Sequence, residues 1–294
     1  MILFKTKKMG KQIYIDEINA SLPDKLKTDI DILVDDVIEG EMDLLIILDG
    51  KEGSGKSYDA RLIAKYISTV TRTPFGVDNI HFSTEKYMNF SESMPKYTIN
   101  VLDESREALN KRRGMSKSNV MFTNWLSENR DKQQIHIIVL PAIHDLDSYI
   151  SIWRMRLLIH KLLGHGKSDR TRSGYKLVRG FFKVYDNNKD LQQVMYNKAK
   201  YGSYAYPRDY KYSRKIKYTQ VFTDEELKNY KMKKAAERRV KYQSDKKKKD
   251  EKAKKFLNVL LESGLSRREI ARKTGMGLNQ VCDLAKEAKE DVVA

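Results

Sequence analysis

The feature that most constrains this chain is an aliphatic run that ends in a glycine-rich loop. Residues 44–48 are consecutive aliphatic residues, which is typical of a strand buried on both faces of a sheet. Residues 50–57 read Gly-Lys-Glu-Gly-Ser-Gly-Lys-Ser and match the phosphate-binding pattern G-x-x-x-x-G-K-S. Apolar residues then recur at helical spacing between 60 and 67. Because the pattern sits between a strand and a helix, we expect an α/β fold with a mostly parallel sheet flanked by helices.

The residue types in the loop explain how it would bind a nucleotide. Glycines let successive backbone N–H groups turn toward an anion, and the next helix adds the positive end of its dipole. We expect Lys56 to reach the β- and γ-phosphates of ATP, and Ser57 to ligate Mg²⁺. A glycine-rich turn without a ligand is the alternative. The predicted nucleotide-binding residues are Gly50, Gly53, Ser54, Gly55, Lys56, Ser57 and Tyr58.

A second β-prone run, residues 97–102, ends in the adjacent carboxylates Asp103 and Glu104. Side chains alternate along a strand, so the two carboxylates point differently and can take different roles. We expect Asp103 to hold Mg²⁺ and Glu104 to polarise the water that attacks the γ-phosphate. The alternative is a strand that ends in a solvated acidic turn.

Three further residues are candidates for sensing or stabilising phosphate charge. Residues 135–140 form another buried-type strand, and His144 follows it as a candidate γ-phosphate sensor. Arg154 and Arg156 are candidates for an arginine finger, which stabilises transition-state charge in its own subunit or in the next one. The alternative for both arginines is ion pairing with Asp145 or Asp147.

Residues 164–174 are rich in glycine and basic side chains. We interpret them as a basic hairpin loop, with residues 175–178 and 181–185 as its strands. In a ring-shaped motor such a loop could face a central channel, whereas as a surface turn it needs no function.

The charge balance points to a polyanionic partner. The net charge is +17, and residues 201–294 hold 25 Lys and Arg against 14 Asp and Glu. Residues 201–250 interleave tyrosines with basic residues and read as a basic linker. No apolar run approaches the ~20 residues that span a bilayer, and no signal-peptide core is present. With Cys282 as the single cysteine, we expect a cytoplasmic protein.

Residues 251–294 are predicted to form a small all-α helix-turn-helix domain. Ser266 and Glu269 have the spacing of a capping box, and Gly275 would permit the turn before a second helix. The alternative is a small helical protein-interaction module. The predicted DNA-binding residues are Arg267, Arg268, Asn279 and Gln280.

Three segments of the chain, taken in sequence order, resemble those of a family of P-loop ATPases of viruses and mobile elements. They are the loop at 50–57, the Asp103-Glu104 strand end and the block at 137–156. These are similar to zonula occludens toxin and, more distantly, to the additional-strand ATPases that include terminase and FtsK/HerA translocases. The resemblance covers residues 43–185. It implies catalytic roles for Lys56, Ser57, Asp103 and Glu104, and it suggests one for Arg154 or Arg156. We expect a homo-oligomer, possibly a ring, in which one subunit's arginine completes its neighbour's site. A membrane segment and a nuclease-like acidic cluster, which some of these proteins carry, are not found in the sequence.

These observations predict a P-loop NTPase domain at 1–200, with its core at 43–185, followed by the linker and the helix-turn-helix. The expected function is ATP-driven movement of double-stranded DNA, as in genome packaging. A filamentous-virion assembly ATPase and an ATP-switched, site-specific DNA-binding regulator or replication factor remain alternatives. A small-molecule kinase leaves Glu104 and the C-terminal domain without a role. Residues 187–190 do not fit the guanine signature of a GTPase.

Overall fold

The computed structural model divides the chain into two compact units, Met1–Tyr230 and Lys231–Ala294. In the described part of the chain, no helix is long and apolar enough to cross a bilayer. The structure describes residues 18, 21–103, 117–147, 149–168, 170, 172–186, 206, 210–240, 243, 265–274, 277, 279, 281, 282 and 285.

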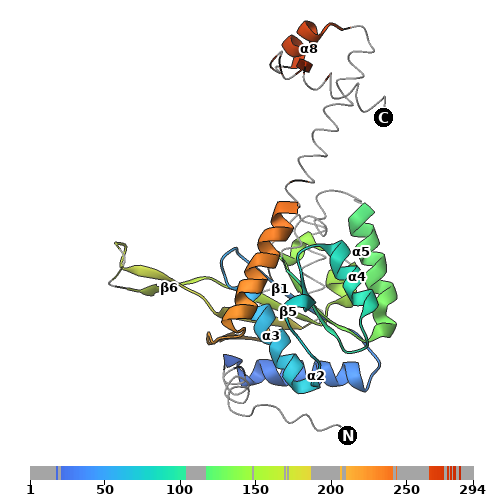
Figure 1. Ribbon diagram of the computed structural model, residues 1–294. Helices are drawn as coiled ribbons and strands as arrows, with labels where there is room; N and C mark the ends of the chain where they lie inside the picture. Colours follow the sequence, from blue (N-terminus) through green and yellow to red (C-terminus); the bar gives the residue numbers. More distant parts are fainter. Residues whose placement is uncertain are drawn as a thin grey trace. The chain divides into compact units, whose positions relative to one another are not determined.

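The first unit is built on a seven-stranded sheet with the order β2-β3-β4-β1-β5-β8-β9 (Figure 1). The first five strands of this order run parallel, and β8 runs antiparallel to both of its neighbours, β5 and β9. The prediction of an α/β fold with a mostly parallel sheet is therefore confirmed. The strands are β1 (Leu44–Gly50), β2 (Ile80–His81), β3 (Ile99–Leu102), β4 (Ile135–Val139), β5 (Leu157–Lys161), β8 (Phe181–Asp186) and β9 (Tyr212–Lys215).

Helices cover both faces of the sheet. α2 (Asp24–Ile38) and α3 (Lys56–Thr71) pack on one face, and α4 (Thr84–Ser93) and α5 (Lys117–Glu128) pack on the other. Along β1, alternate side chains enter the two apolar clusters on opposite faces, which is why the strand is aliphatic throughout. Short 3₁₀ segments lie at Val77–Asn79, Asn129–Lys132 and Ile143–Asp145, and a π-helical turn at Tyr149–Arg154.

The segment after residue 211 extends the first unit. β9 pairs with β8 at the edge of the sheet, and a helix over residues 224–240 begins in the same unit. Part of the stretch that the sequence suggested as a linker therefore contributes to the core of the first unit. Its buried side chains are Tyr212, Ile216, Val221, Phe222 and Tyr230.

A separate two-stranded hairpin, β6 (Gly164–Lys167) with β7 (Tyr175–Val178), lies between β5 and β8 in the chain. Figure 1 shows it projecting outward from the sheet. The expected pairing of 175–178 with 181–185 is wrong. Residues 175–178 pair with 164–167 instead, because residues 181–186 are apolar enough to enter the main sheet beside β5.

The described part of the second unit contains α8 (Arg267–Thr274). Glu269 accepts hydrogen bonds from the backbone N–H and the hydroxyl of Ser266, and Ser266 Oγ accepts one from the Glu269 N–H, which completes the expected capping box. Ile270, Val281 and Ala285 form a small buried cluster. Gly275 and Gln280 lie outside the described residues, and the helix-turn-helix stays a prediction.

Candidate nucleotide-binding site

The glycine-rich loop leaves the sheet at the carboxyl end of its central strand β1 and enters α3 at Lys56. Gly50 has φ 124°, and a Cβ there would lie 2.3 Å from the carbonyl oxygen of Lys161 on the neighbouring strand. Gly55, at φ 98°, precedes the first helical residue. Both positions require glycine, and the backbone they allow directs the N-terminus of α3 toward the loop.

Lys56 folds back over this loop. Its Nζ donates hydrogen bonds to the carbonyl oxygens of Gly50, at 2.6 Å, and Lys51, at 2.9 Å. Phosphate oxygens in the loop would offer the ammonium group charged acceptors, and hydrogen bonds between charged groups are the stronger ones. The ammonium group of Lys56 therefore lies against the backbone of the loop, and its role in phosphate binding stays a prediction.

Ser57 and Asp103 meet across the site. Ser57 Oγ donates a hydrogen bond of 2.8 Å to Asp103 Oδ1, although the two residues are 46 apart in sequence. Asp103 follows β3, whose carboxyl end lies at the same edge of the sheet as that of β1. A hydroxyl and a buried carboxylate are the hard oxygen ligands that Mg²⁺ prefers, so the two residues fit the ion expected here.

Asp103 has another partner, which the sequence did not reveal. Tyr230 OH, from the helix at 224–240, donates a 2.7 Å hydrogen bond to Asp103 Oδ2. Burial and the neighbouring carboxylate raise the pKa of Tyr230, so its hydroxyl stays protonated as a donor. The Arg61 guanidinium lies 4.4 Å from the centroid of the Tyr230 ring. Glu104 lies outside the described residues.

Two more side chains, from residues that follow β7 and β9 in the sequence, lie against the phosphate loop. Arg179, directly after β7, donates a 2.6 Å hydrogen bond from Nε to the carbonyl oxygen of Gly53. The ring of Tyr218 packs 4.7 Å from that of Tyr58, and its hydroxyl lies close to Gly55. Burial raises the pKa of Tyr218 to about 12. Neither residue belongs to a sequence motif, so only the tertiary structure shows that they lie at the phosphate loop.

Beneath the loop lies a fully buried ion pair between Lys161 and Asp59. Burial outweighs the attraction of the ammonium group and raises the pKa of Asp59 to about 6. The backbone of Lys161 also limits the space at Gly50. The pair therefore ties β5 to α3 below the phosphate loop.

A polar cluster surrounds Asp49, the residue before the loop. Asp49 pairs with His160 Nδ1 at 2.8 Å, accepts a hydrogen bond from Tyr206 OH, and accepts one of 2.8 Å from the Ile143 N–H. His144 is buried, with its ring 5.2 Å from that of Tyr206. The candidate sensor is thus at the carboxyl edge of the sheet, on the side of Asp49. In the sequence, the one indication of this cluster is Asp49 itself, a polar residue in an otherwise aliphatic strand.

Neither candidate finger arginine reaches the loop of its own chain. Arg154 is buried and pairs with Asp43, which precedes β1, and it also donates to the Leu126 carbonyl at 2.8 Å. Asp43 lies at the amino end of β1, about 20 Å from the loop at ~3.3 Å per strand residue. The ion pair forms with Asp43 and not with Asp145 or Asp147, the aspartates expected from the sequence, because the fold brings the start of β1 beside Arg154.

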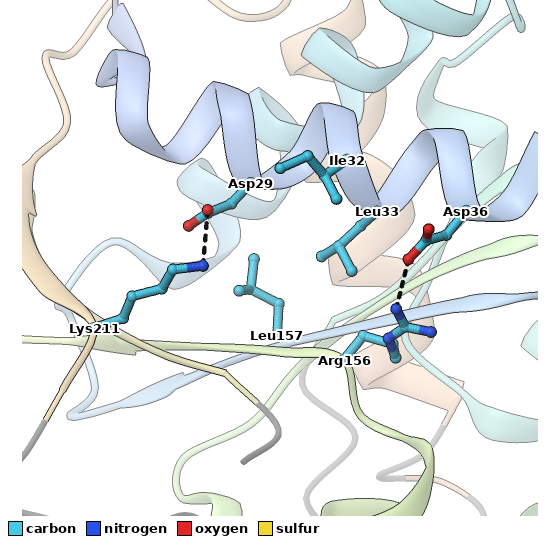
Figure 2. A pocket seen from close by; sticks show the side chains of 7 residues that line it. All are labelled: Asp29, Ile32, Leu33, Asp36, Arg156, Leu157 and Lys211. Carbon is cyan, nitrogen blue, oxygen red and sulfur yellow. Dashed lines mark hydrogen bonds and ion pairs between the residues drawn. The ribbon is translucent and has the colours of Figure 1, made fainter.

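Arg156 lies at the same amino edge and is partly exposed. Its Nη2 bonds Asp36 on α2 at 2.6 Å. Figure 2 shows this pair and the Lys211–Asp29 pair at the two ends of a pocket between α2 and the start of β5. The pocket is therefore remote from the phosphate loop.

The parallel sheet, the loop after β1 and the Ser57–Asp103 pair define a P-loop NTPase fold. No protein-family model matches the chain, and no curated protein matches it in sequence.

Two solved structures are similar to the chain in fold. One is the genome packaging NTPase B204 from Sulfolobus turreted icosahedral virus 2, solved in complex with ATP-gammaS. It is 16% identical at a TM-score of 0.33, and the match covers 50% of this chain and 93% of that one. The other is the N-terminal domain of zonular occludens toxin from Neisseria meningitidis, which is 14% identical at a TM-score of 0.32, with 61% and 96% covered.

Proposed function

We propose that this protein hydrolyses ATP and uses the energy to move double-stranded DNA, as in packaging the genome of a virus or mobile element. The observation that supports ATP hydrolysis most directly is the hydrogen bond between Ser57 and Asp103. It joins the start of α3 to the end of β3, and so places a hydroxyl and a carboxylate together beside a phosphate-binding loop. A phosphate loop alone needs no such partner, whereas a Mg²⁺-nucleotide site does.

In this proposal each side chain has a separate role. The loop from Gly50 to Gly55, with Ser54 and Tyr58, holds the nucleotide, and Lys56 moves from the loop carbonyls to the β- and γ-phosphates. Ser57 and Asp103 hold Mg²⁺, which neutralises phosphate charge. Glu104 polarises the attacking water, as a carboxylate beside the γ-phosphate can.

The DNA-binding part of the proposal rests on charge. The chain carries a net charge of +17. In the second unit Arg267, Arg268 and Asn279 are exposed, with the two arginines in the first turn of a capped helix. We propose these three side chains and Gln280 as DNA contacts. Phosphate contacts of this kind make affinity strongly salt-dependent.

Measuring ATP hydrolysis with and without double-stranded DNA tests the proposal, with Lys56→Ala and Glu104→Gln beside the wild type. We expect DNA to stimulate hydrolysis. Lys56→Ala should lose nucleotide binding, whereas Glu104→Gln should still bind ATP but hydrolyse it at least about 100-fold more slowly. Hydrolysis that ignores DNA, in a protein that does not bind DNA, would overturn the motor.

A DNA-binding regulator switched by ATP is the second candidate, because the second unit has a capped helix over its own buried cluster. It predicts tight binding to one DNA sequence together with slow turnover that DNA does not change. Hydrolysis stimulated by a coat or membrane partner would instead identify a virion-assembly ATPase.

An arginine finger, if this protein uses one between subunits, has to come from an exposed position. Arg154 is buried in its ion pair, whereas Arg156 is partly exposed. We therefore keep Arg156 as the proposed finger of a homo-oligomer. Arg156→Ala should slow hydrolysis without weakening ATP binding, and mixing it with Lys56→Ala subunits should restore part of the activity.

A further inference from the structure

The β6–β7 hairpin exposes most of its described side chains. From 172 to 177 every residue is exposed, including the large apolar side chains Tyr175, at 54%, and Leu177, at 44%. Its two strands pair with each other and not with the main sheet. An isolated two-stranded hairpin is marginally stable in water, so side chains held outward in this way suggest a partner.

The chemistry of the hairpin indicates what the partner is. Lys167, Arg170, Arg172 and Lys176 are exposed along it, and Tyr175 lies beside Lys176. Basic side chains with an exposed aromatic ring suit phosphate contacts combined with base or sugar packing. A two-stranded ribbon also has the width that the DNA major groove admits.

We propose that the β6–β7 hairpin is a double-stranded DNA-binding arm of the first unit, separate from the contacts proposed in the second unit. This inference rests on the proposed function, since it names the surface that would hold the DNA. The arm is long enough for the task. Its first strand, Gly164–Lys167, spans about 10 Å at ~3.3 Å per residue, slightly more than the ~8.5 Å depth of the major groove.

The root of the hairpin connects the arm to the nucleotide loop. β7 ends at Val178, and the next residue, Arg179, bonds the Gly53 carbonyl at 2.6 Å. Gly180 follows at φ 98°, and a Cβ there would lie 2.7 Å from the Ile216 carbonyl oxygen, so the chain is fixed at this point. A single residue, Arg179, therefore connects the end of the hairpin to the proposed ATP-binding loop.

The test compares two variants with four neutralised charges each. The hairpin variant is Lys167→Gln, Arg170→Gln, Arg172→Gln and Lys176→Gln. The matched control is Lys86→Gln, Lys96→Gln, Arg130→Gln and Lys228→Gln, all exposed positions of the same unit. Both variants lose the same net charge, so a difference between them reports position and not total charge.

Affinity for a double-stranded DNA of mixed sequence is measured by fluorescence anisotropy at several salt concentrations. The slope of log affinity against log salt changes by about 0.9 for each phosphate contact. We expect the hairpin variant to lose about 3 to 4 from this slope, and the control to keep the wild-type slope. The smaller variant Arg170→Gln with Arg172→Gln, at the turn, should lose about 2.

The possible failures are distinguishable. If the wild-type chain binds no DNA, both the DNA-binding proposal and this inference are wrong. If the wild type binds DNA and the hairpin variant keeps the wild-type slope, only the hairpin inference is wrong, and binding lies elsewhere in the chain. Equal losses in both variants would also overturn it, because total charge would then explain the affinity. Binding of the arm to anionic vesicles but not to DNA would identify a membrane partner instead.

Discussion

At the scale of single residues, Tyr230 is the side chain most closely tied to the proposed metal site. Its hydroxyl holds one oxygen of Asp103 while Ser57 holds the other. We therefore expect Tyr230 to orient the carboxylate for Mg²⁺. Tyr230→Phe removes the hydroxyl and keeps the buried ring.

Titrating Mg²⁺ against a fluorescent ATP analogue measures this effect without relying on turnover. Tyr230→Phe should raise the Mg²⁺ concentration needed for half-maximal binding by about 5-fold, the ~1 kcal/mol of a typical hydrogen bond. Tyr212→Phe is the matched control, since Tyr212 is also buried and bonds a carboxylate, that of Asp29, at 2.6 Å. Tighter Mg²⁺ binding in Tyr230→Phe would show that the hydroxyl blocks the site instead.

The buried side chain of His136 makes the free energy of unfolding depend on pH. Burial lowers its pKa from 6.5 to about 4, and Tyr87 OH lies 2.6 Å from its Nδ1. Between pH 6.5 and 4 the unfolded chain binds a proton there that the folded chain does not, so the free energy of unfolding falls as the pH falls. The shift corresponds to about 3 kcal/mol. Chemical denaturation at pH 7 and pH 4.5 should show a smaller loss in His136→Gln than in the wild type.

The buried Lys161–Asp59 pair should respond differently to single and double substitution. Lys161→Met leaves a buried carboxylate without its partner and should lower the free energy of unfolding by about 3 to 5 kcal/mol. Lys161→Met combined with Asp59→Leu removes both charges and should recover most of that loss. Equal stability of the single and double variants in urea denaturation would contradict this account.

At the scale of elements, the segment from β9 into the helix at 224–240 is part of the fold. It buries five large apolar or aromatic side chains, each worth roughly 1.5–3 kcal/mol, against a total stability of about 5–15 kcal/mol. A chain ending at residue 205 should therefore not fold, whereas one ending at residue 245 should. Thermal unfolding and ATP binding of the two truncations check this.

The elements also differ in how far the sequence predicted them. β1, β4 and α3 were predictable because each is marked by the spacing of apolar residues within a short segment. That spacing follows from burial on one or both faces of the element. The pairing of 175–178 was not predictable, since it depends on whether residues 181–186 pair with 175–178 or join the main sheet beside β5. β8 joins the main sheet because Phe182 and Val184 are buried there, which depends on β5 beside it.

At the scale of the whole molecule, DNA binding should have two separable parts. The hairpin belongs to the first unit and the capped helix α8 to the second. A chain ending at residue 245 keeps the hairpin and loses α8, so it should still bind DNA with a salt-dependent affinity but without preference for sequence. Competition between specific and random DNA, measured for the full chain and for the chain ending at residue 245, would show this. Complete loss of binding would place all DNA contacts after residue 245.

The sequence by itself determined the phosphate loop, the strand and helix around it, and the carboxylate at Asp103. Each of these is specified by neighbours within a few residues, through spacing, side-chain size and backbone freedom. The contact between Ser57 and Asp103 was predictable as well, because parallel strands bring their carboxyl ends to one edge.

Tertiary structure alone decided which distant side chains complete the site. Tyr230 and Arg179 lie 127 residues from Asp103 and 126 from Gly53 in sequence, and they reach the loop because β8, β9 and the helix at 224–240 return to the sheet. The same folding takes Arg154 away from the loop into its pair with Asp43, 111 residues earlier. Such contacts depend on how strands are ordered in the sheet, which no local spacing encodes.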